Sequence, residues 1–259
     1  MDDIEPGHKK QRRGIYLLPN LFTTAALFAG FYAIVEGMSG RVEAAAVAIF
    51  IAMILDGADG RIARMTNTQS AFGAEYDSLS DVISFGLAPA ILFYSWSLDG
   101  MGKIGWLAAF FYAAATALRL ARFNTQVGTT DKRYFQGLPC PMAAAVMAGL
   151  VWFATDYGMN GDQLSWVCFV VTIITGVLMV SNVRFHSFKE IDLRGRVPFV
   201  ALLVVVLIFM LVFSDPPLVL FLLAILYALS GPFLTLVHIR RRRAERKTQL
   251  ASEGTANNK

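Results

Sequence analysis

The sequence predicts an all-α fold, a polytopic transmembrane helical bundle with about eight spans. Hydrophobic residues make up 56% of the 259 residues and charged residues only 16%, and the mean hydropathy is +0.52. Apolar runs of roughly 20 residues recur along the chain, and a helix of that length crosses the hydrocarbon core of a bilayer. Charged residues collect in alternate breaks between these runs, as expected of a chain that crosses a membrane repeatedly.

The apolar runs define the predicted spans, and the breaks between them carry glycine, proline and aspartate, which favour turns. The break at Asp215-Pro216-Pro217 is so short that the last two spans must form a tight helical hairpin. The predicted spans are about 15–36, 41–58, 82–98, 104–122, 138–157, 163–182, 197–214 and 216–238.

Basic residues predict the orientation of the bundle. The breaks between spans form two alternating sets, one rich in lysine and arginine and the other uncharged or acidic. Of the 23 lysines and arginines, only Arg41 and Lys103 fall in the uncharged or acidic set. The positive-inside rule therefore places both termini and the aspartate-rich segment 55–81 on the cytoplasmic side. The net charge of +4 reflects this topology and contact with anionic lipid headgroups, and no nucleic-acid partner is expected.

No part of the chain is predicted to form a soluble domain. The two cysteines, Cys140 and Cys168, are expected to be ordinary helix residues rather than a disulfide or a metal cluster. The predicted segments are a basic cytoplasmic N-terminus (1–14), a core of six spans (15–182), a cytoplasmic loop with two additional spans (183–238), and a basic, disordered cytoplasmic tail (239–259).

Four aspartates lie in the segment "LDGADGRIARMTNTQSAFGAEYDSLSD" at positions 55–81. Asp56 and Asp59 are three residues apart, and Asp77 and Asp81 are four apart, so each pair shares one helix face. A connection of roughly 17 residues lets the two helix ends lie side by side. Four converging carboxylates would repel one another, and a bound divalent cation relieves this repulsion. Ligands that are all carboxylates suit Mg²⁺ or Mn²⁺.

Small and basic residues between the aspartates indicate phosphoryl transfer. Gly60, Ala63 and Gly73 allow a phosphorylated ligand to approach the backbone closely, and Arg64 offers a guanidinium fork to a phosphate. Metal-ligating carboxylates beside an arginine are what such a transfer needs. The simpler interpretation, a set of interfacial salt bridges, fits the number and spacing of these carboxylates poorly.

This segment resembles the signature of the CDP-alcohol phosphatidyltransferases, and every fixed position of that signature is present. The resemblance covers roughly residues 15–182 and implies the six-helix core of that family, with the last two spans outside it. The fixed positions are Asp56, Asp59, Gly60, Ala63, Arg64, Gly73, Asp77 and Asp81.

The resemblance implies a phosphotransferase for substituted phosphate groups, which moves a phosphatidyl group from CDP-diacylglycerol to an alcohol and releases CMP. It implies that Asp56, Asp59 and Asp77 bind two Mg²⁺ or Mn²⁺ ions, and that Asp81 binds metal and is also the catalytic base. It further implies a homodimer. The residues implied to bind CDP-diacylglycerol are Gly60, Ala63, Arg64, Ser70 and Gly73, with Pro19, Asn20 and Thr23 from the upstream "LPNLFTT".

The flanking segments "YDSLSDVISFGLAPA", "ALRLARFN" and "YFQGLPCPMAA" resemble the membrane-embedded branch of the family that uses L-serine, the type II phosphatidylserine synthases. Glycerophosphate-using members tend to read Asp-Pro-x-Ala-Asp-Lys, whereas this chain reads Asp77-Ser-Leu-Ser-Asp81-Val. The serine carboxylate needs a cation, and an arginine within a span, such as Arg119, is costly unless it is functional or paired. The candidate residues on the acceptor side are Arg119, Arg122, Lys132, Arg133, Gly137 and Pro139.

Other hypotheses remain open at this point. Glycerol 3-phosphate and inositol phosphate are the alternative acceptors, because the signature does not name the alcohol. A cation-coupled transporter is a further hypothesis, although transporters usually place such carboxylates near the membrane midplane. The three histidines fit no His-x-Lys-x4-Asp motif, so a direct displacement is expected instead of a covalent histidine intermediate. The expected location is a bacterial cytoplasmic membrane, with the site facing the cytoplasm.

Overall fold

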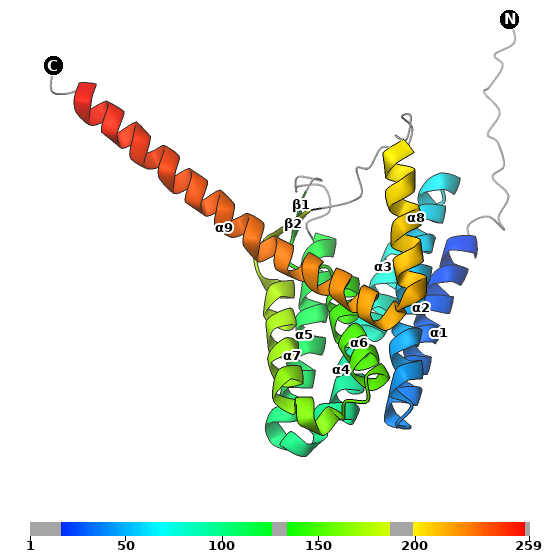
Figure 1. Ribbon diagram of the computed structural model, residues 1–259. Coiled ribbons are helices and arrows are strands. Elements are labelled where there is room, and N and C mark those ends of the chain that lie inside the picture. Colours follow the sequence, from blue (N-terminus) through cyan, green and yellow to red (C-terminus); the bar gives the residue numbers. More distant parts are fainter. Residues whose placement is uncertain (1–16, 126–133, 187–198, 257–259) are drawn as a thin grey trace, which may run out of the picture.

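A computed structural model describes residues 17–125, 134–186 and 199–256 (Figure 1). The described chain is nearly all helical, with two short strands and several short helical turns, so the predicted helical bundle is confirmed. The longer helices are α1 (Leu17–Met38), α2 (Val42–Thr66), α3 (Ala71–Asp81), α5 (Lys103–Thr125), α6 (Cys140–Asp156), α7 (Ser165–Val180), α8 (Phe199–Ser214) and α9 (Pro216–Ala256).

Each predicted span has a helix in the structure, and five helical stretches within the described ranges are long and apolar enough to cross a membrane. Helix α6 is apolar but shorter. The chain is therefore a multi-pass membrane protein. The five stretches are Leu17–Met38, Ala71–Met101, Lys103–Thr125, Gly161–Val180 and Pro216–Leu236.

Helices α1 and α2 form an antiparallel hairpin, and α1 also packs against the third span. Small residues permit this packing, because they allow helix backbones to approach closely. At Gly30 of α1, a Cβ atom would overlap Ser84 in the third span. The hydroxyl of Ser84 donates a hydrogen bond of 3.1 Å to the carbonyl of Ala26. These contacts fix α1 beside the helix that carries Asp77 and Asp81.

The third span is a continuous helical path that changes its winding. It begins as α3, widens into a π-helical turn directly after Asp81, and returns to an α-helix. Such π-helical turns are frequent at functional sites. Its later elements are η2 (Val82–Leu87), α4 (Ala88–Phe93), η3 (Tyr94–Leu98) and η4 (Asp99–Met101).

The link between the second and third spans is much shorter than the sequence suggested. Helix α2 continues to Thr66 and α3 begins at Ala71, so only residues 67–70 connect them, not roughly 17. Asn67 adopts the left-handed conformation that ends α2 (φ 51°), and the Ser70 hydroxyl caps α3 by accepting from the Gly73 amide at 3.0 Å. Arginine, alanine and methionine in 61–65 are good helix formers, which explains the extension of α2.

Helix α6 lies at the centre of the bundle. Eleven of its 17 residues are buried, including all five of its alanines, and it contacts α2, α4, α7 and α9. A helix that is apolar all round is expected in such a position. Residues just before α6 form β1 (Tyr134–Gln136), which pairs antiparallel with β2 (Arg184–His186) after α7.

The last two helices form the predicted hairpin. Asp215 separates α8 from α9 and accepts a hydrogen bond from the Leu218 amide at 3.1 Å, as a helix cap does. Helix α9 continues to Ala256, through the tail for which the sequence favoured disorder. Arginine, lysine, alanine, glutamate and glutamine dominate 240–250, and these residues favour helix.

One end of the bundle gathers the chain segments that carry the signature. The start of α1, the end of α2, the start of α3 and the β1–β2 ribbon all lie at the upper end in Figure 1. The turn between α1 and α2 lies at the opposite end, where Arg41 pairs with Glu36.

Candidate active site

Three of the four signature aspartates converge between α2 and α3. Asp56, Asp59 and Asp77 each offer one carboxylate oxygen, and these oxygens all lie within 4.8 Å of one another. Asp59 is buried and the other two are partly buried. Hard oxygen ligands at this spacing fit a divalent cation such as Mg²⁺ or Mn²⁺, so the donor set matches the metal that the sequence predicted.

Helix α1 supports this cluster with Thr23. The Thr23 hydroxyl lies 2.6 Å from Asp59 Oδ2, to which it donates, and 3.2 Å from the carbonyl of Pro19. Both Thr23 and Asp59 are almost completely buried. Partners of this kind orient a metal-binding carboxylate and are as important to a metal site as the ligands themselves.

Asp81 lies one helical turn beyond Asp77, at the end of α3. Its carboxylate lies beside Asp56, and Asp77 and Asp59 are near enough to interact with it electrostatically. It does not belong to the set of three carboxylates that converge within 4.8 Å. The structure therefore gathers all four aspartates in one region, with Asp81 beside Asp56 but outside the group of three converging oxygens.

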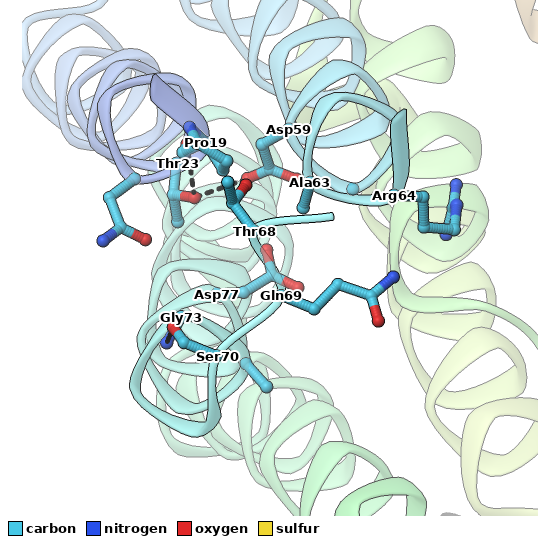
Figure 2. Close-up of a pocket in the computed structure, with 13 residues that line it drawn as sticks. Pro19, Thr23, Asp59, Ala63, Arg64, Thr68, Gln69, Ser70, Gly73 and Asp77 are labelled. Carbon is cyan, nitrogen blue, oxygen red and sulfur yellow. Dashed lines mark hydrogen bonds between the residues drawn. The ribbon is translucent and has the colours of Figure 1, made fainter. Parts of the chain in front are cut away.

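A cavity of about 200 Å³ opens beside the cluster (Figure 2). Asp59 and Asp77 enter it from α2 and α3, and Arg64 lies on the α2 side. All eight residues that the resemblance assigned to CDP-diacylglycerol line this cavity. They are Pro19, Asn20, Thr23, Gly60, Ala63, Arg64, Ser70 and Gly73.

The two glycines of the signature differ in what surrounds them. A Cβ atom at Gly73 would lie 3.1 Å from the Ser70 hydroxyl and 3.4 Å from Asn20 Oδ1. Within the described part of the chain, a Cβ at Gly60 would meet only the Arg64 guanidinium, at 3.9 Å. Gly73 therefore allows tight packing within the protein, whereas Gly60 leaves space that a ligand can fill.

Sequence reasoning missed three cavity residues, Thr68, Gln69 and Ala74. Thr68 is buried, and its hydroxyl lies 2.7 Å from that of Thr66. No helical or metal-ligand pattern marks the turn 67–70. The position of this turn between the two aspartate pairs was the feature of the sequence that could have indicated its place in the cavity.

The two candidate arginines of α5 have different surroundings. Arg122 donates to Gln136 Oε1 at 2.7 Å and to Asn182 Oδ1 at 2.6 Å, and so ties α5 to the segments around the β1–β2 ribbon. Arg119 is only 9% exposed, and its Nη1 donates to Cys140 Sγ at 3.2 Å. Its Nε atom has no hydrogen-bond partner among the described residues. A buried guanidinium with an unused N–H group can still donate a hydrogen bond to an anionic ligand.

The remaining acceptor-side candidates lie around the start of α6 or outside the described ranges. Gly137 has φ +78°, and a Cβ there would overlap the Met179 carbonyl, so the backbone requires glycine at this position. Pro139 precedes the first residue of α6. Lys132 and Arg133 lie outside the described residues.

Cys140, at the start of α6, is buried and unpaired with Cys168, as expected. Its thiol is near enough to both Arg119 and Asp81 to interact with them electrostatically. The start of α6 therefore contacts the buried arginine and lies in the neighbourhood of the fourth aspartate, which links the acceptor-side residues to the aspartate cluster.

Comparisons with known proteins agree with this geometry. The family model described as CDP-alcohol phosphatidyltransferase matches residues 16–181. A CDP-diacylglycerol–serine O-phosphatidyltransferase of Helicobacter pylori is 38% identical over 203 residues, which cover 78% of this chain and 84% of the relative. A protein of the same name from Mycobacterium tuberculosis is 32% identical over 234 residues, covering 88% and 82%. An archaetidylserine synthase of Methanothermobacter thermautotrophicus is 34% identical over 170 residues, covering 65% and 69%.

Proposed function

The chain belongs to the CDP-alcohol phosphatidyltransferase family, and we propose that it transfers the phosphatidyl group of CDP-diacylglycerol to L-serine. The products are phosphatidylserine and CMP. The observation that carries this proposal is the convergence of Asp56, Asp59 and Asp77 beside a cavity lined by the rest of the signature. The serine-specific names of the relatives support L-serine as the acceptor.

Asp56, Asp59 and Asp77 would hold the divalent cations, two per site as in the family. Bound Mg²⁺ or Mn²⁺ would neutralise charge on the pyrophosphate of the substrate. Thr23 keeps the Asp59 carboxylate oriented through their hydrogen bond of 2.6 Å.

The cavity beside the cluster would receive the cytidine diphosphate group. Gly60 leaves room for close approach to the α2 backbone, and the exposed Arg64 can donate to phosphate oxygens. Asn20 and Ser70 also line the cavity and offer further polar atoms. The acyl chains would extend into the bilayer around the bundle.

Asp81 is proposed as the general base. It would take the proton of the serine hydroxyl while the serine oxygen forms a bond to the lipid-side phosphorus. The bond between this phosphorus and the bridging oxygen breaks, and the electron pair leaves with CMP. The position of Asp81 at the end of α3, beside Asp56, supports this role, because a carboxylate next to the proposed metal ligands is close to where the reacting groups would bind.

Arg119 is proposed to bind the serine carboxylate. It is buried, it lies near Cys140, and its Nε is available among the described residues. An arginine fork matches a carboxylate well, and a charged hydrogen bond of this kind is strong. Arg122 would act indirectly, by fixing the ribbon beside the start of α6.

The charge pattern supports a cytoplasmic location for the active site and both termini, in a bacterial cytoplasmic membrane. Serine would then enter from the cytosol and CDP-diacylglycerol from the inner leaflet. A homodimer remains a prediction from the family resemblance.

An acceptor panel tests the proposed function. Purified protein with CDP-diacylglycerol and Mn²⁺ or Mg²⁺ is offered L-serine, glycerol 3-phosphate or inositol phosphate, and CMP release is measured. We expect release with L-serine alone. Release with another acceptor but not with serine would contradict the assigned acceptor while leaving the family chemistry intact.

A further inference from the structure

Helix α5 packs along the third span, beside the residues that follow Asp81. Tyr112, Thr116 and Arg119 succeed one another at spacings of four and three residues, so they share one face of α5. All three are buried, and α5 contacts the π-helical turn η2 that begins directly after Asp81. The register of α5 against the third span therefore decides where Arg119 lies relative to Asp81.

The first contact that sets this register is a hydrogen bond to the π-helical turn. The hydroxyl of Tyr112, which is fully buried, donates to the backbone carbonyl of Phe85 at 3.0 Å. In an uninterrupted α-helix this carbonyl would accept from the amide of residue 89, but Pro89 has no N–H group. Tyr112 therefore gives a buried carbonyl the donor that residue 89 does not supply.

A second contact lies one residue further along the third span. At Gly86, a Cβ atom would lie 3.2 Å from both Cβ and Cγ2 of Thr116. The two helix backbones can approach closely here because residue 86 has no side chain. Sliding α5 along the third span would bring a different residue against this glycine, so the contact favours one register.

A third contact lies on the other side of Asp81. The side-chain amide of Asn124, near the end of α5, donates to the Ser78 hydroxyl at 3.0 Å. The same hydroxyl donates to the carbonyl of Ala74 within α3, also at 3.0 Å, which fixes its orientation. Ser78 precedes Asp81 by three residues and Phe85 follows it by four. The fourth aspartate therefore lies between two hydrogen bonds that come from side chains of the same helix.

The spacing of these contacts matches on the two helices. Eight positions separate Ser78 from Gly86, and eight separate their partners Asn124 and Thr116, so the two segments run antiparallel. At about 1.5 Å per residue, the fourth aspartate and the buried arginine then differ in level by about 3 Å along the helix pair. A difference of this size suits one small acceptor, whose hydroxyl and carboxylate are separated by only a few bonds.

On the premise of the proposed function, we propose that Asn124 and Tyr112 are positioning residues. They lock α5 against the third span, so that Arg119 holds the serine carboxylate while the serine hydroxyl lies at Asp81. A displacement of about 1 Å at the reacting groups can cost on the order of 100-fold in rate. Loss of either contact should therefore lower kcat/KM for serine. Binding of CDP-diacylglycerol and metal should change little, because those residues come from α1, α2 and the segment up to Asp77.

A double-mutant cycle on Asn124 and Ser78 tests the inference in the full-length enzyme. Asn124→Ala and Ser78→Ala should each lower kcat/KM for serine about five- to tenfold, and the double variant should lose no more than either single variant. The KM for CDP-diacylglycerol and the Mn²⁺ concentration at half-maximal activity should stay within about twofold. Ser97→Ala is the matched control, because Ser97 donates to the Gly161 carbonyl at 2.7 Å near the other end of the same span. The control should keep normal kinetics.

Tyr112→Phe tests the contact on the other side of Asp81. The variant keeps the buried ring and removes only the hydroxyl, and it should lower kcat/KM for serine by a similar factor. Tyr157→Phe is its control, because the Tyr157 hydroxyl donates to Asp215 Oδ2 at 3.0 Å, in the link between α8 and α9. Its kinetic constants should match those of wild type.

An Arg119→Gln background separates positioning from a general loss of stability. In that background Asn124→Ala should lower kcat/KM for serine by no more than about twofold, because the group whose position it sets is absent. An unchanged kcat/KM in Asn124→Ala alone, or an equal decrease in both backgrounds, would overturn the inference. A wild-type enzyme that does not use serine would overturn the proposed function first, so the two failures are distinguishable.

Discussion

The hydroxyl of Thr23 donates a 2.6 Å hydrogen bond to the carboxylate of Asp59, joining residues 36 positions apart. It connects the first helix, which carries no signature aspartate, to the face of the second that is proposed to bind metal. A carboxylate held in this way loses less freedom on binding a cation. On the proposed function, the "LPNLFTT" segment would therefore support the metal ligands as well as line the nucleotide cavity.

Replacing Thr23 with valine should weaken metal binding about tenfold, because the variant loses this oriented partner but keeps a similar shape. The readout is the Mn²⁺ concentration at half-maximal activity, and saturating Mn²⁺ should restore most of the activity. Thr172→Val is the control, because Thr172 is a buried threonine that donates to a backbone carbonyl in α7, at 2.7 Å. Equal Mn²⁺ dependence in the two variants would argue against a role for Thr23 in the metal site.

Gly73→Ala should raise the KM for CDP-diacylglycerol several-fold. The added methyl would lie 3.1 Å from the Ser70 hydroxyl and 3.4 Å from Asn20 Oδ1, so it would displace groups that line the cavity. Gly57→Ala is the control, since no atom lies within 4 Å of a Cβ there. That control should keep normal kinetics and gain about 0.5–1 kcal/mol of stability from helix propensity. Unchanged substrate affinity in Gly73→Ala would contradict the proposed location of the nucleotide.

The two arginines of α5 should respond differently to substitution by glutamine. Arg119→Gln should raise the KM for serine about 10- to 100-fold, as expected for the loss of a charge-assisted hydrogen bond to the substrate. Arg122→Gln should mainly lower thermal stability, because the donors of Arg122 bind Gln136 and Asn182 of the protein itself. A larger serine effect in Arg122→Gln would reverse the two assignments.

Removal of divalent cations should abolish activity without unfolding the bundle. Three carboxylates that converge within 4.8 Å fit a cation, while the bundle itself is held by apolar packing. Chelation with EDTA followed by an assay of CMP release tests this, with circular dichroism to monitor the helices. Added Mg²⁺ or Mn²⁺ should restore activity, and full activity after exhaustive chelation would contradict a metal-assisted transfer.

The order of the helices could be predicted from the sequence because each apolar run is long and bounded by turn residues. The polar stretch 61–70 gave no apolar period, so neither the extension of α2 nor the short link to α3 could be foreseen. The β1–β2 ribbon was also missed. Its pairing of Phe135 with Phe185 depends on how α5, α6 and α7 pack, and three-residue strands carry little local signal.

The site was predictable to the extent that its residues are close in sequence. The spacing of Asp56, Asp59 and Asp77 suggested their convergence, and the structure brings them together. The difference between Arg119 and Arg122 was not predictable, because it depends on Cys140, Gln136 and Asn182, which come from other segments.

The central claim is tested most directly by lipid product formation in wild type and in Asp81→Asn. Purified protein is incubated with CDP-diacylglycerol, Mn²⁺ and isotope-labelled L-serine, and phosphatidylserine and CMP are quantified together. We expect wild type to form equal amounts of the two products, and Asp81→Asn, which cannot take up the hydroxyl proton, to form at least about 100-fold less. Near-normal phosphatidylserine formation by Asp81→Asn, or CMP release by wild type without labelled lipid, would contradict the proposed transfer.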